Sequence, residues 1–516
     1  MTIIKKIKYN SKKNINKKTM YFGIDFGTTY SLIATTFLKN ILIITDKENR
    51  ELLPSIVNYS FPRPVVGWNA KNKILYDPTN TITSVKRLIG LSLKEIKQLY
   101  PYLPYNFKEI EKKNVSFIVK NSTINVIDVS SQIFRILKRR VVSLFKKDIE
   151  GVVITVPAHF NDIQRHNIKK IAQLENLHVL RLLNEPTAAA IAYGMHLKNK
   201  GIIIIYDLGG GTFDVSILSL NKHVFEVLST AGSTHLGGDD IDYLLLNYIK
   251  NKFLSFNSND FLLEQELLNL AKTIKIKLSF ENCVSVKFKS QKLQITQVEF
   301  NNLIQPIIVK TLNICQSALK SANISIKNVD NVILVGGSTY IPIIRRYVEE
   351  YFKQSPLFSI NPDQVVAVGA AIQANMLTQK NTKNNILLLD VVPLSLGIEI
   401  MGGVVEKIIF KNTKIPISQT REFTTFKDNQ ESILIHVLQG EENTVKKCKS
   451  LFKFVLSNIP KKPAGKTIVI VKFQIDVNGI LSIIAKIKST NIKKKISINS
   501  IYKLNELKTF NMIEKN

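Results

Sequence analysis

The fold is decided by a short stretch in which an apolar strand ends in an acidic residue and a glycine-rich turn. This stretch reads Ile205-Tyr206-Asp207-Leu208-Gly209-Gly210-Gly211-Thr212-Phe213-Asp214. The strand delivers a carboxylate at its end, and the turn exposes backbone N–H groups beside a hydroxyl. Oriented N–H groups and hydroxyls bind phosphate oxygens, and a carboxylate can hold Mg²⁺ through water. The stretch therefore predicts a phosphate-binding turn.

A first copy of the pattern stands about 180 residues upstream and reads Gly23-Ile24-Asp25-Phe26-Gly27-Thr28-Thr29. The duplication predicts two similar α/β lobes, each offering an aspartate and a Gly/Thr turn to one cleft. A third glycine cluster, Leu334–Thr339, follows a buried strand, and close backbone approach there suits a nucleobase or ribose. The sequence contains no GxxxxGK[ST] and no GxGxxG after a strand, which excludes a P-loop and a dinucleotide fingerprint.

Mixed α/β structure is expected from Tyr21 to about Gln379. One helix is predicted to open at Asn161 and another to cover Phe261–Leu278. Short apolar runs bounded by glycine predict buried strands, at Tyr21–Phe26, Val152–Val156, Ile202–Tyr206 and Val332–Val335.

After Pro393 the pattern changes to that of an all-β domain. Apolar residues at 471, 473, 475 and 477 alternate with polar ones. Asn478-Gly479 then predicts a type I′ hairpin turn before a strand at Ile480–Lys486. The change of pattern places a domain boundary near residues 381–392.

Composition excludes several other classes of protein. The 516 residues are 45% hydrophobic and 22% charged, which is typical of globular domains. Cys283, Cys315 and Cys448 stand far apart, which argues against a disulfide framework or a cysteine-ligated metal. No apolar run reaches the roughly 18 residues that a membrane span requires. We therefore expect a soluble, cytoplasmic protein with no membrane partner.

The net charge is unusual, because 71 basic residues stand against 40 acidic ones and give +31. Such a field attracts polyanions. The lysines are nevertheless spread along the whole chain beside Asn and Ile, so a composition bias and a functional polyanion surface both remain open. We expect no specific nucleic-acid partner.

From Tyr21 to Ser500 the chain resembles the superfamily of actin, hexokinase and the 70-kDa heat-shock proteins, and the heat-shock chaperones most. The family motifs are found at Asn184–Ala190, Asp207–Asp214 and Val332–Pro342. The branch that serves iron–sulfur cluster assembly is more similar still, at Tyr100–Tyr105, Val179–Asn184 and Glu422–Asp428. The resemblance implies a two-lobed actin-like ATPase domain, a duplicated ribonuclease-H-like fold, followed by an all-β peptide-binding sandwich.

The resemblance also implies the domain order. The expected parts are a basic N-terminal tail over 1–19, a nucleotide-binding ATPase domain over 20–380, an interdomain linker over 381–392, a β-sandwich substrate-binding domain over 393–500, and a remnant of a lid helix over 501–516. The family carries a helical lid after the sandwich, and the sequence ends at Asn516. We therefore expect the lid to be absent.

ATP and Mg²⁺ are the cofactors that the resemblance implies. The implied catalytic residues are Lys71, which matches the catalytic lysine of the family, and Glu185, Asp207 and Asp25. Asp25 and Asp214 are implied to hold Mg²⁺ through water. Nucleotide binding is implied for Gly27, Thr28, Thr29, Tyr30, Gly209, Gly210, Gly211, Thr212, Gly237, Gly238, Lys275, Ser279, Gly336, Gly337, Ser338, Tyr340 and Asp363.

Two positions depart from the family pattern. Chaperones of this family commonly sandwich adenine between two arginines, and here those positions hold Ile276 and Tyr340. Tyr340 can stack on the base, whereas Ile276 offers no cation–π contact. We therefore expect weaker nucleotide retention than in a general chaperone.

The sandwich is implied to bind extended peptide across its strands. The implied cleft residues are Ile398, Met401, Phe423, Phe426, Ile433 and Ile435. Coupling between the domains is implied for Pro157, Arg165, Leu388, Leu389 and Asp390. The implied partners are a J-domain co-chaperone and an iron–sulfur scaffold protein or another client peptide, with the chaperone itself a monomer.

The favoured hypothesis is thus an ATP-hydrolysing chaperone that helps to transfer iron–sulfur clusters from a scaffold protein. A general protein-folding chaperone of the same family is the first alternative. An actin-like structural ATPase and a small-molecule kinase share the ATPase lobes, but neither gives residues 393–500 a role. A nucleic-acid-binding protein depends on net charge alone.

Overall fold

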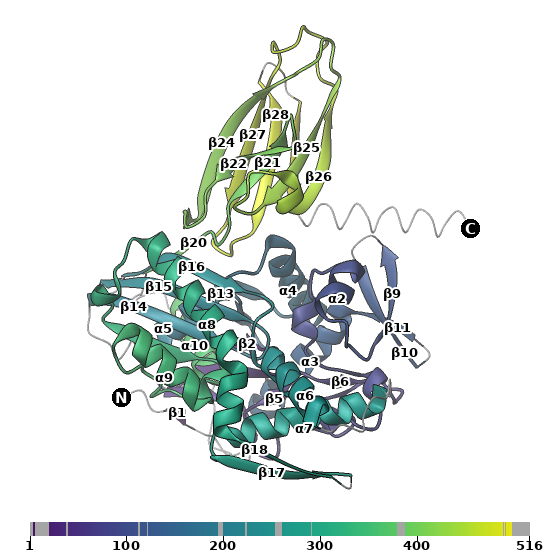
Figure 1. Ribbon diagram of the computed structural model, residues 1–516. Helices are drawn as coiled ribbons and strands as arrows, with labels where there is room; N and C mark the ends of the chain where they lie inside the picture. Colours follow the sequence, from purple (N-terminus) through teal and green to yellow (C-terminus); the bar gives the residue numbers. More distant parts are fainter. Residues whose placement is uncertain are drawn as a thin grey trace. The chain divides into compact units, whose positions relative to one another are not determined.

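The computed structural model divides into two compact units, the first formed from residues 1–159 and 169–387 and the second from 160–168 and 388–516 (Figure 1). The described residues are 4–5, 20–37, 40–111, 114–120, 122–194, 200–221, 224–252, 261–289, 291–378, 387–488, 490 and 492–497. The predicted tail except Ile4–Lys5, linker residues 381–386 and the predicted lid remnant at 501–516 lie outside them. The division after Leu387 falls within the segment predicted as linker.

The first lobe of the first unit is built on a mixed sheet whose central strand carries the first glycine motif. The strands lie in the order β1 (Ile4–Lys5), β4 (Asn40–Ile43), β3 (Tyr30–Phe37), β2 (Tyr21–Phe26), β12 (Gly151–Val156) and β13 (Val179–Asn184), and β5 (Leu53–Pro54) pairs with β3. Strand β2 pairs antiparallel with β3 and parallel with β12. Its even burial on both faces explains why the sequence shows a continuous apolar run there.

The second lobe repeats this arrangement. Its strands lie in the order β19 (Asn331–Val335), β14 (Lys200–Leu208), β15 (Phe213–Asn221) and β16 (Val224–Ser233). Strand β14 pairs antiparallel with β15 and parallel with β19, as β2 does with β3 and β12. The predicted duplication and the four predicted buried strands are therefore confirmed.

Helices cover both sheets of the first unit. Helix α10 packs on β2 and β3 so closely that a Cβ atom on Gly23 would collide with the backbone of Ala371. Helix α7 has the predicted bounds, and Asn161 caps the start of α4 by accepting a hydrogen bond from the Gln164 N–H (3.0 Å). The helices are α1 (Trp68–Lys71), α2 (Leu93–Leu99), α3 (Val126–Phe145), α4 (Asp162–Leu174), α5 (Glu185–Gly194), α6 (Gly238–Lys252), α7 (Phe261–Leu278), α8 (Gln297–Ala322), α9 (Pro342–Phe352) and α10 (Val365–Thr378).

The first unit also contains smaller elements. Short sheets are formed by β9 (Asn106–Glu111), β10 (Asn114–Val119) and β11 (Ser122–Asn125), by β6 (Val57–Asn58), β7 (Val65–Val66) and β8 (Thr81–Ile82), and by the hairpin of β17 (Cys283–Phe288) and β18 (Gln291–Thr296). A 3₁₀ helix over Val85–Leu88 carries two buried cationic residues toward the cleft. Another covers Gly337–Tyr340, directly after β19.

The second unit is a sandwich of two antiparallel sheets, seen in green and yellow in Figure 1. One sheet has the order β22 (Val404–Ile409), β21 (Leu396–Ile400), β25 (Ser432–Gln439) and β26 (Lys449–Ser457). The other has the order β24 (Ile417–Thr424), β27 (Ile468–Ile475), β28 (Leu481–Ile487) and β29 (Lys493–Ser497). Strand β20 (Leu387–Val391) pairs with β23 (Lys414–Ile415). The predicted fold class is confirmed.

The predicted alternation of buried and exposed residues in β27 is confirmed, but the predicted type I′ turn after this strand is wrong. Val471, Phe473 and Ile475 are buried in the core, whereas Val477 lies beyond the strand and is exposed. A type I′ turn needs positive φ at both central residues. Only Gly479 has it, at +72°, and the loop is closed instead by the carboxylate of Asp476, which accepts from two backbone N–H groups.

Phe473→Ala is expected to destabilise the sandwich strongly, because Phe473 is fully buried at the centre of its core. Removing a buried phenyl ring costs about 3–5 kcal/mol. Hydrogen exchange read on peptides of β27 and β28 should report an opening free energy lower by that amount. Val477→Ala is the matched control and should change it by less than about 0.5 kcal/mol. Equal effects of the two substitutions would contradict this account of the core.

Candidate active site

The two glycine turns approach each other at close range. A Cβ atom on Gly210 would collide with Thr29 Oγ1, and one on Gly211 would lie 3.0 Å from Thr28 Cγ2. The turns leave β2 and β14 at equivalent points of the two sheets. The structure thus brings together the predicted phosphate-binding residues Gly27, Thr28, Thr29, Gly209, Gly210, Gly211 and Thr212.

Further glycines line the same region with backbone rather than side chains. The Ser338 hydroxyl donates to the Gly209 carbonyl (2.9 Å), and so does the Gly238 N–H (2.9 Å). Gly336 has φ +85°, and a Cβ atom there would collide with the Leu208 carbonyl. Gly237 and Gly337 complete this set, which links the end of β19 and the start of α6 to the second turn.

Carboxylates from both lobes gather behind the turns. Glu185, Asp207 and Asp214 are buried, and Asp25 stands at the end of β2. Burial and the negative charges of Asp25 and Asp214 raise the pKa of Glu185 to about 7. Burial and the neighbouring carboxylates raise the pKa of Asp207 well above its ordinary value, and desolvation raises that of Asp25. The cluster therefore carries more negative charge than the protein alone compensates.

One buried lysine stands among these carboxylates, and it is Lys86 rather than Lys71. Lys86 Nζ lies 2.6 Å from Glu185 Oε1, and its charge opposes the rise in the pKa of the neighbouring aspartates. Lys71 is exposed; its Nζ lies 3.4 Å from the Tyr30 hydroxyl and 4.9 Å from the centre of the Trp68 ring. The structure does not bring Lys71 to the carboxylates, because α1 directs it away toward these rings.

Thr155 and His159 orient two of the aspartates, and sequence reasoning missed both. Thr155 Oγ1 donates to Asp25 Oδ1 (3.1 Å). His159 Nδ1 lies 2.8 Å from Asp214 Oδ1, with both side chains largely buried. Each residue belongs to β12 or the loop after it, where no motif singles it out. The buried position in β12 was the available signal for Thr155 alone.

The predicted nucleoside residues lie around α7 and the end of β19. Lys275 Nζ contacts Asp242 Oδ1 (2.7 Å) and the Gly238 carbonyl (2.9 Å), while the Ser279 hydroxyl donates to the Lys275 carbonyl (3.1 Å). Burial and the charge of Asp25 raise the pKa of Asp363 to about 6. The Tyr340 hydroxyl donates to Asn361 Oδ1 (2.9 Å). Ile276, at a position where the family commonly has an arginine, is exposed.

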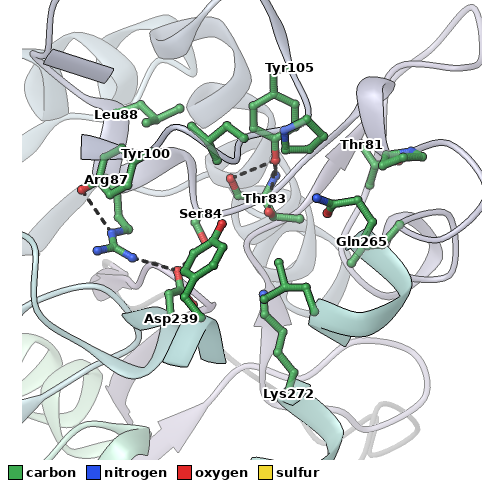
Figure 2. A pocket seen from close by; sticks show the side chains of 16 residues that line it. Thr81, Thr83, Ser84, Arg87, Leu88, Tyr100, Tyr105, Asp239, Gln265 and Lys272 are labelled. Carbon is green, nitrogen blue, oxygen red and sulfur yellow. Dashed lines mark hydrogen bonds and ion pairs between the residues drawn. The ribbon is translucent and has the colours of Figure 1, made fainter. Parts of the chain in front are cut away.

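The two lobes are also bonded to each other beside the cleft, around a hollow of about 50 Å³ (Figure 2). Arg87 of the first lobe lies 3.1 Å from Asp240 Oδ2 and 3.4 Å from Asp239 Oδ2 of α6. The Ser84 hydroxyl donates to Asp239 Oδ2 (2.9 Å). Figure 2 shows the Arg87 guanidinium directed at both Tyr100 and Asp239. These bonds hold the two lobes together and so favour a closed cleft. A closed cleft would oppose the weaker nucleotide retention that is expected from Ile276.

The cluster suits a nucleotide with a divalent cation. Four carboxylates lie around Lys86. Burial raises the pKa of Asp25, Glu185 and Asp207, and repulsion between carboxylates adds to the rise at Glu185 and Asp207, so a cation placed among them would favour their charged forms. Within the described part of the chain no group of three or more His, Cys, Asp or Glu is arranged to ligate a metal directly. Asp25 and Asp214 therefore fit Mg²⁺ held through water and phosphate rather than in a protein cage.

The predicted peptide residues divide into two groups. Ile398 and Ile435 are buried in the core between the sheets, as ordinary core residues would be. Met401 and Phe426 are exposed, with 83% and 62% of their surface accessible. Phe423 and Ile433 are half-buried and pack against the core.

The predicted coupling residues are distributed over both units. Pro157 is buried directly after β12 in the first unit. Arg165 is buried in the second unit, where its guanidinium donates to the carbonyls of Phe160 (3.1 Å) and Asn478 (3.4 Å). Leu388 and Asp390 are buried in β20, and Leu389 is half-buried. Coupling through these residues stays a prediction.

None of the described helices combines the length and the apolar character that crossing a membrane demands. A family model described as Hsp70 protein matches residues 21–516. The chain is 58% identical over 504 residues to chaperone protein HscA of Buchnera aphidicola subsp. Baizongia pistaciae, with 97% of this chain and 98% of that protein covered.

Two further relatives carry the same name. Chaperone protein HscA of Buchnera aphidicola subsp. Schizaphis graminum is 50% identical, with 95% of this chain and 80% of that protein covered. The HscA of Proteus mirabilis is 45% identical, with 97% and 81% covered. Together with the two-lobed cleft and the β sandwich, these matches show that the chain belongs to the Hsp70 family.

Proposed function

We propose that this Hsp70-family chaperone hydrolyses ATP between its two glycine turns and uses the cycle to bind and release client peptide. The observation that supports hydrolysis is the position of Lys86, buried among carboxylates directly behind the phosphate-binding turns. Phosphoryl transfer depends chiefly on positioning and on neutralising charge at the transferring group. A single buried ammonium at this point is suited to that task.

Each group of the cleft has a role in this proposal. The backbone N–H groups of the two turns and the hydroxyls of Thr28, Thr29 and Thr212 hold phosphate oxygens. Asp25 and Asp214 hold Mg²⁺ through water, and the metal supplies charge neutralisation when bound. Glu185 fixes the Lys86 ammonium by its 2.6 Å ion pair, and together with Asp207 it orients the attacking water. Thr155 and His159 keep the two metal-facing aspartates in place.

Lys86→Ala is expected to lower the single-turnover rate of ATP hydrolysis by roughly 100- to 1,000-fold while nucleotide binding survives, because a transition-state charge is lost and the turns remain. Lys71→Ala removes an equal charge from an exposed site and should stay within a few-fold of wild type. Nucleotide affinity is measured alongside by calorimetry. The opposite order of the two variants would restore Lys71 as the catalytic lysine.

We infer that the client belongs to iron–sulfur cluster assembly and that a J-domain co-chaperone assists. The inference is supported by the HscA relatives and by the motifs of that branch at 100–105, 179–184 and 422–428. A general folding chaperone remains the alternative. The family match across both units disfavours a kinase or an actin-like filament, since neither uses a peptide-binding sandwich. Cytoplasmic location and a monomeric state stay predictions.

Phe426 supports a preference for apolar segments that contain proline. Its ring is 62% exposed in the loop after β24, where the Lys427 ammonium lies 5.3 Å from the ring centre and the backbone is tied to Gln430. An exposed, fixed aromatic face can pack against a proline ring. A scaffold segment of this kind is therefore the proposed occupant of the cleft.

Phe426→Ala is expected to weaken binding of a short proline-containing apolar peptide by roughly tenfold, the loss of about 1.4 kcal/mol of apolar burial. Phe410→Ala is the matched control, because Phe410 is also exposed in the second unit but lies outside the predicted cleft. Fluorescence anisotropy of a labelled peptide measures both. Equal affinities for the two variants would count against Phe426 as part of the peptide site.

A further inference from the structure

A hollow of about 310 Å³ lies in the first lobe, away from the carboxylate cluster. Its polar walls come from the loop at residues 45–50, the start of α1 at Trp68 and Asn69, and one face of α3 with Arg139 and Arg140, and Leu53 of β5 and Val66 of β7 complete the lining. The proposed ATPase cycle gives this hollow no role. Its volume exceeds that of a few waters and suits a small organic molecule.

Cationic side chains outnumber acidic ones on its walls. The lining includes four cationic side chains, Lys47, Arg50, Arg139 and Arg140, and two acidic ones, Asp46 and Glu48. Arg50 engages both acids, with 2.8 Å from its Nε to Asp46 and 2.8 Å from its Nη2 to Glu48. Among the described residues, Arg139 and Lys47 make no ion pair. Both acids are thus engaged by Arg50, and Asp46 is also engaged by Arg140 at 3.6 Å. With four cationic and two acidic side chains, the walls keep a net positive charge.

Arg140 is the buried cationic side chain of the hollow. It is 6% exposed, and burial lowers its pKa to about 10. Its guanidinium donates to the Glu51 carbonyl (2.8 Å), while the carboxylate of Asp46 lies 3.6 Å away. Its Nε–H is buried and has no hydrogen-bond acceptor among the described residues. A buried cation is costly unless it is compensated, and an anion in the hollow that Arg140 lines would add to the compensation that Asp46 gives it.

The side chains that line the hollow suit a small organic molecule that carries a phosphate group. Guanidinium groups match phosphate oxygens in a two-pronged geometry, and Thr45, Asn69 and Ser143 add neutral polar groups. The Trp68 ring, with the Arg50 guanidinium 5.3 Å from its centre, forms a flat apolar wall. The Trp68 N–H is anchored on the Leu52 carbonyl (3.1 Å), so that wall is fixed in place.

We propose that this hollow is a binding site for a small phosphate-bearing anion, held by Arg140 and Arg139 against the face of Trp68. The site is distinct from the nucleotide cleft, and the proposal does not depend on ATP hydrolysis. Trp68 is the only tryptophan of the chain, so its fluorescence reports directly on occupancy.

The test uses the full chain, with its cleft saturated by Mg²⁺ and ADP, at an ionic strength near 0.15 M, where weak attraction by the net charge is screened. Inorganic pyrophosphate is the probe, followed by Trp68 fluorescence and by calorimetry. The expected result is a saturable signal. Arg139→Gln should weaken it roughly tenfold or more, since a charge-assisted hydrogen bond is lost.

Two further variants complete the experiment. Arg140→Lys keeps the charge but removes the planar guanidinium that matches phosphate oxygens, and it should also weaken binding, provided that its thermal unfolding matches wild type. Arg346→Gln removes one charge from the exposed face of α9 and is the matched control. Binding lost equally in Arg139→Gln and Arg346→Gln, or no saturation in wild type, would overturn the proposal. Lys86→Ala, provided that its thermal unfolding matches wild type, should leave the pyrophosphate signal unchanged, and loss of the signal in this folded variant would assign it to the cleft instead.

Discussion

The ion pair between Lys86 and Glu185 is the interaction on which the active site of this protein depends. Both side chains are buried, and the pair places Lys86 among carboxylates from both lobes. Breaking a buried pair by removing one partner leaves an uncompensated charge, which is strongly unfavourable. Burial and the repulsion of neighbouring carboxylates raise the pKa of Asp207 and Glu185, and a cation bound among these groups would favour their charged forms.

The duplicated sheets deliver these carboxylates because each motif is local. A strand, its terminal aspartate and the following turn are contiguous in sequence, so the motifs at 23–29 and 205–214 predicted both the lobes and the phosphate-binding turns. Lys86 comes from a 3₁₀ helix and His159 from a loop, and each reaches the site only through the tertiary fold. The resemblance singled out Lys71 by its motif, and nothing in the sequence marked Lys86. Only the structure shows that Lys86 is 3% exposed beside the carboxylates while Lys71 lies at the surface.

In the sandwich, too, local sequence predicted the strand but not the contacts made by side chains in the folded chain. Alternation with period two predicted which side chains of β27 face the core. The turn after it was predicted from a two-residue signal, and the Asp476 carboxylate overrode that preference by closing a longer loop. Side-chain hydrogen bonds of this kind compete with the intrinsic preference of the turn. The peptide residues were likewise chosen by resemblance, and only the structure separates the core pair Ile398 and Ile435 from the exposed Met401 and Phe426.

The cationic side chains of the protein fall into a small buried group and a large surface group. Among the described residues four cationic side chains are buried, Lys86, Arg87, Arg140 and Arg165, and three of them are arginines although only 11 of the 71 basic residues are. The excess lysine is therefore at the surface, as a composition bias would place it. Buried cations must be individually compensated. Lys86 has Glu185, Arg87 has Asp239 and Asp240, and Arg165 has backbone carbonyls. Arg140 has Asp46 at 3.6 Å and the Glu51 carbonyl, and it differs from the other three because it lines a hollow with further cationic walls. For that reason the hollow, and not the lysine-rich surface as a whole, is where we place a specific anion site.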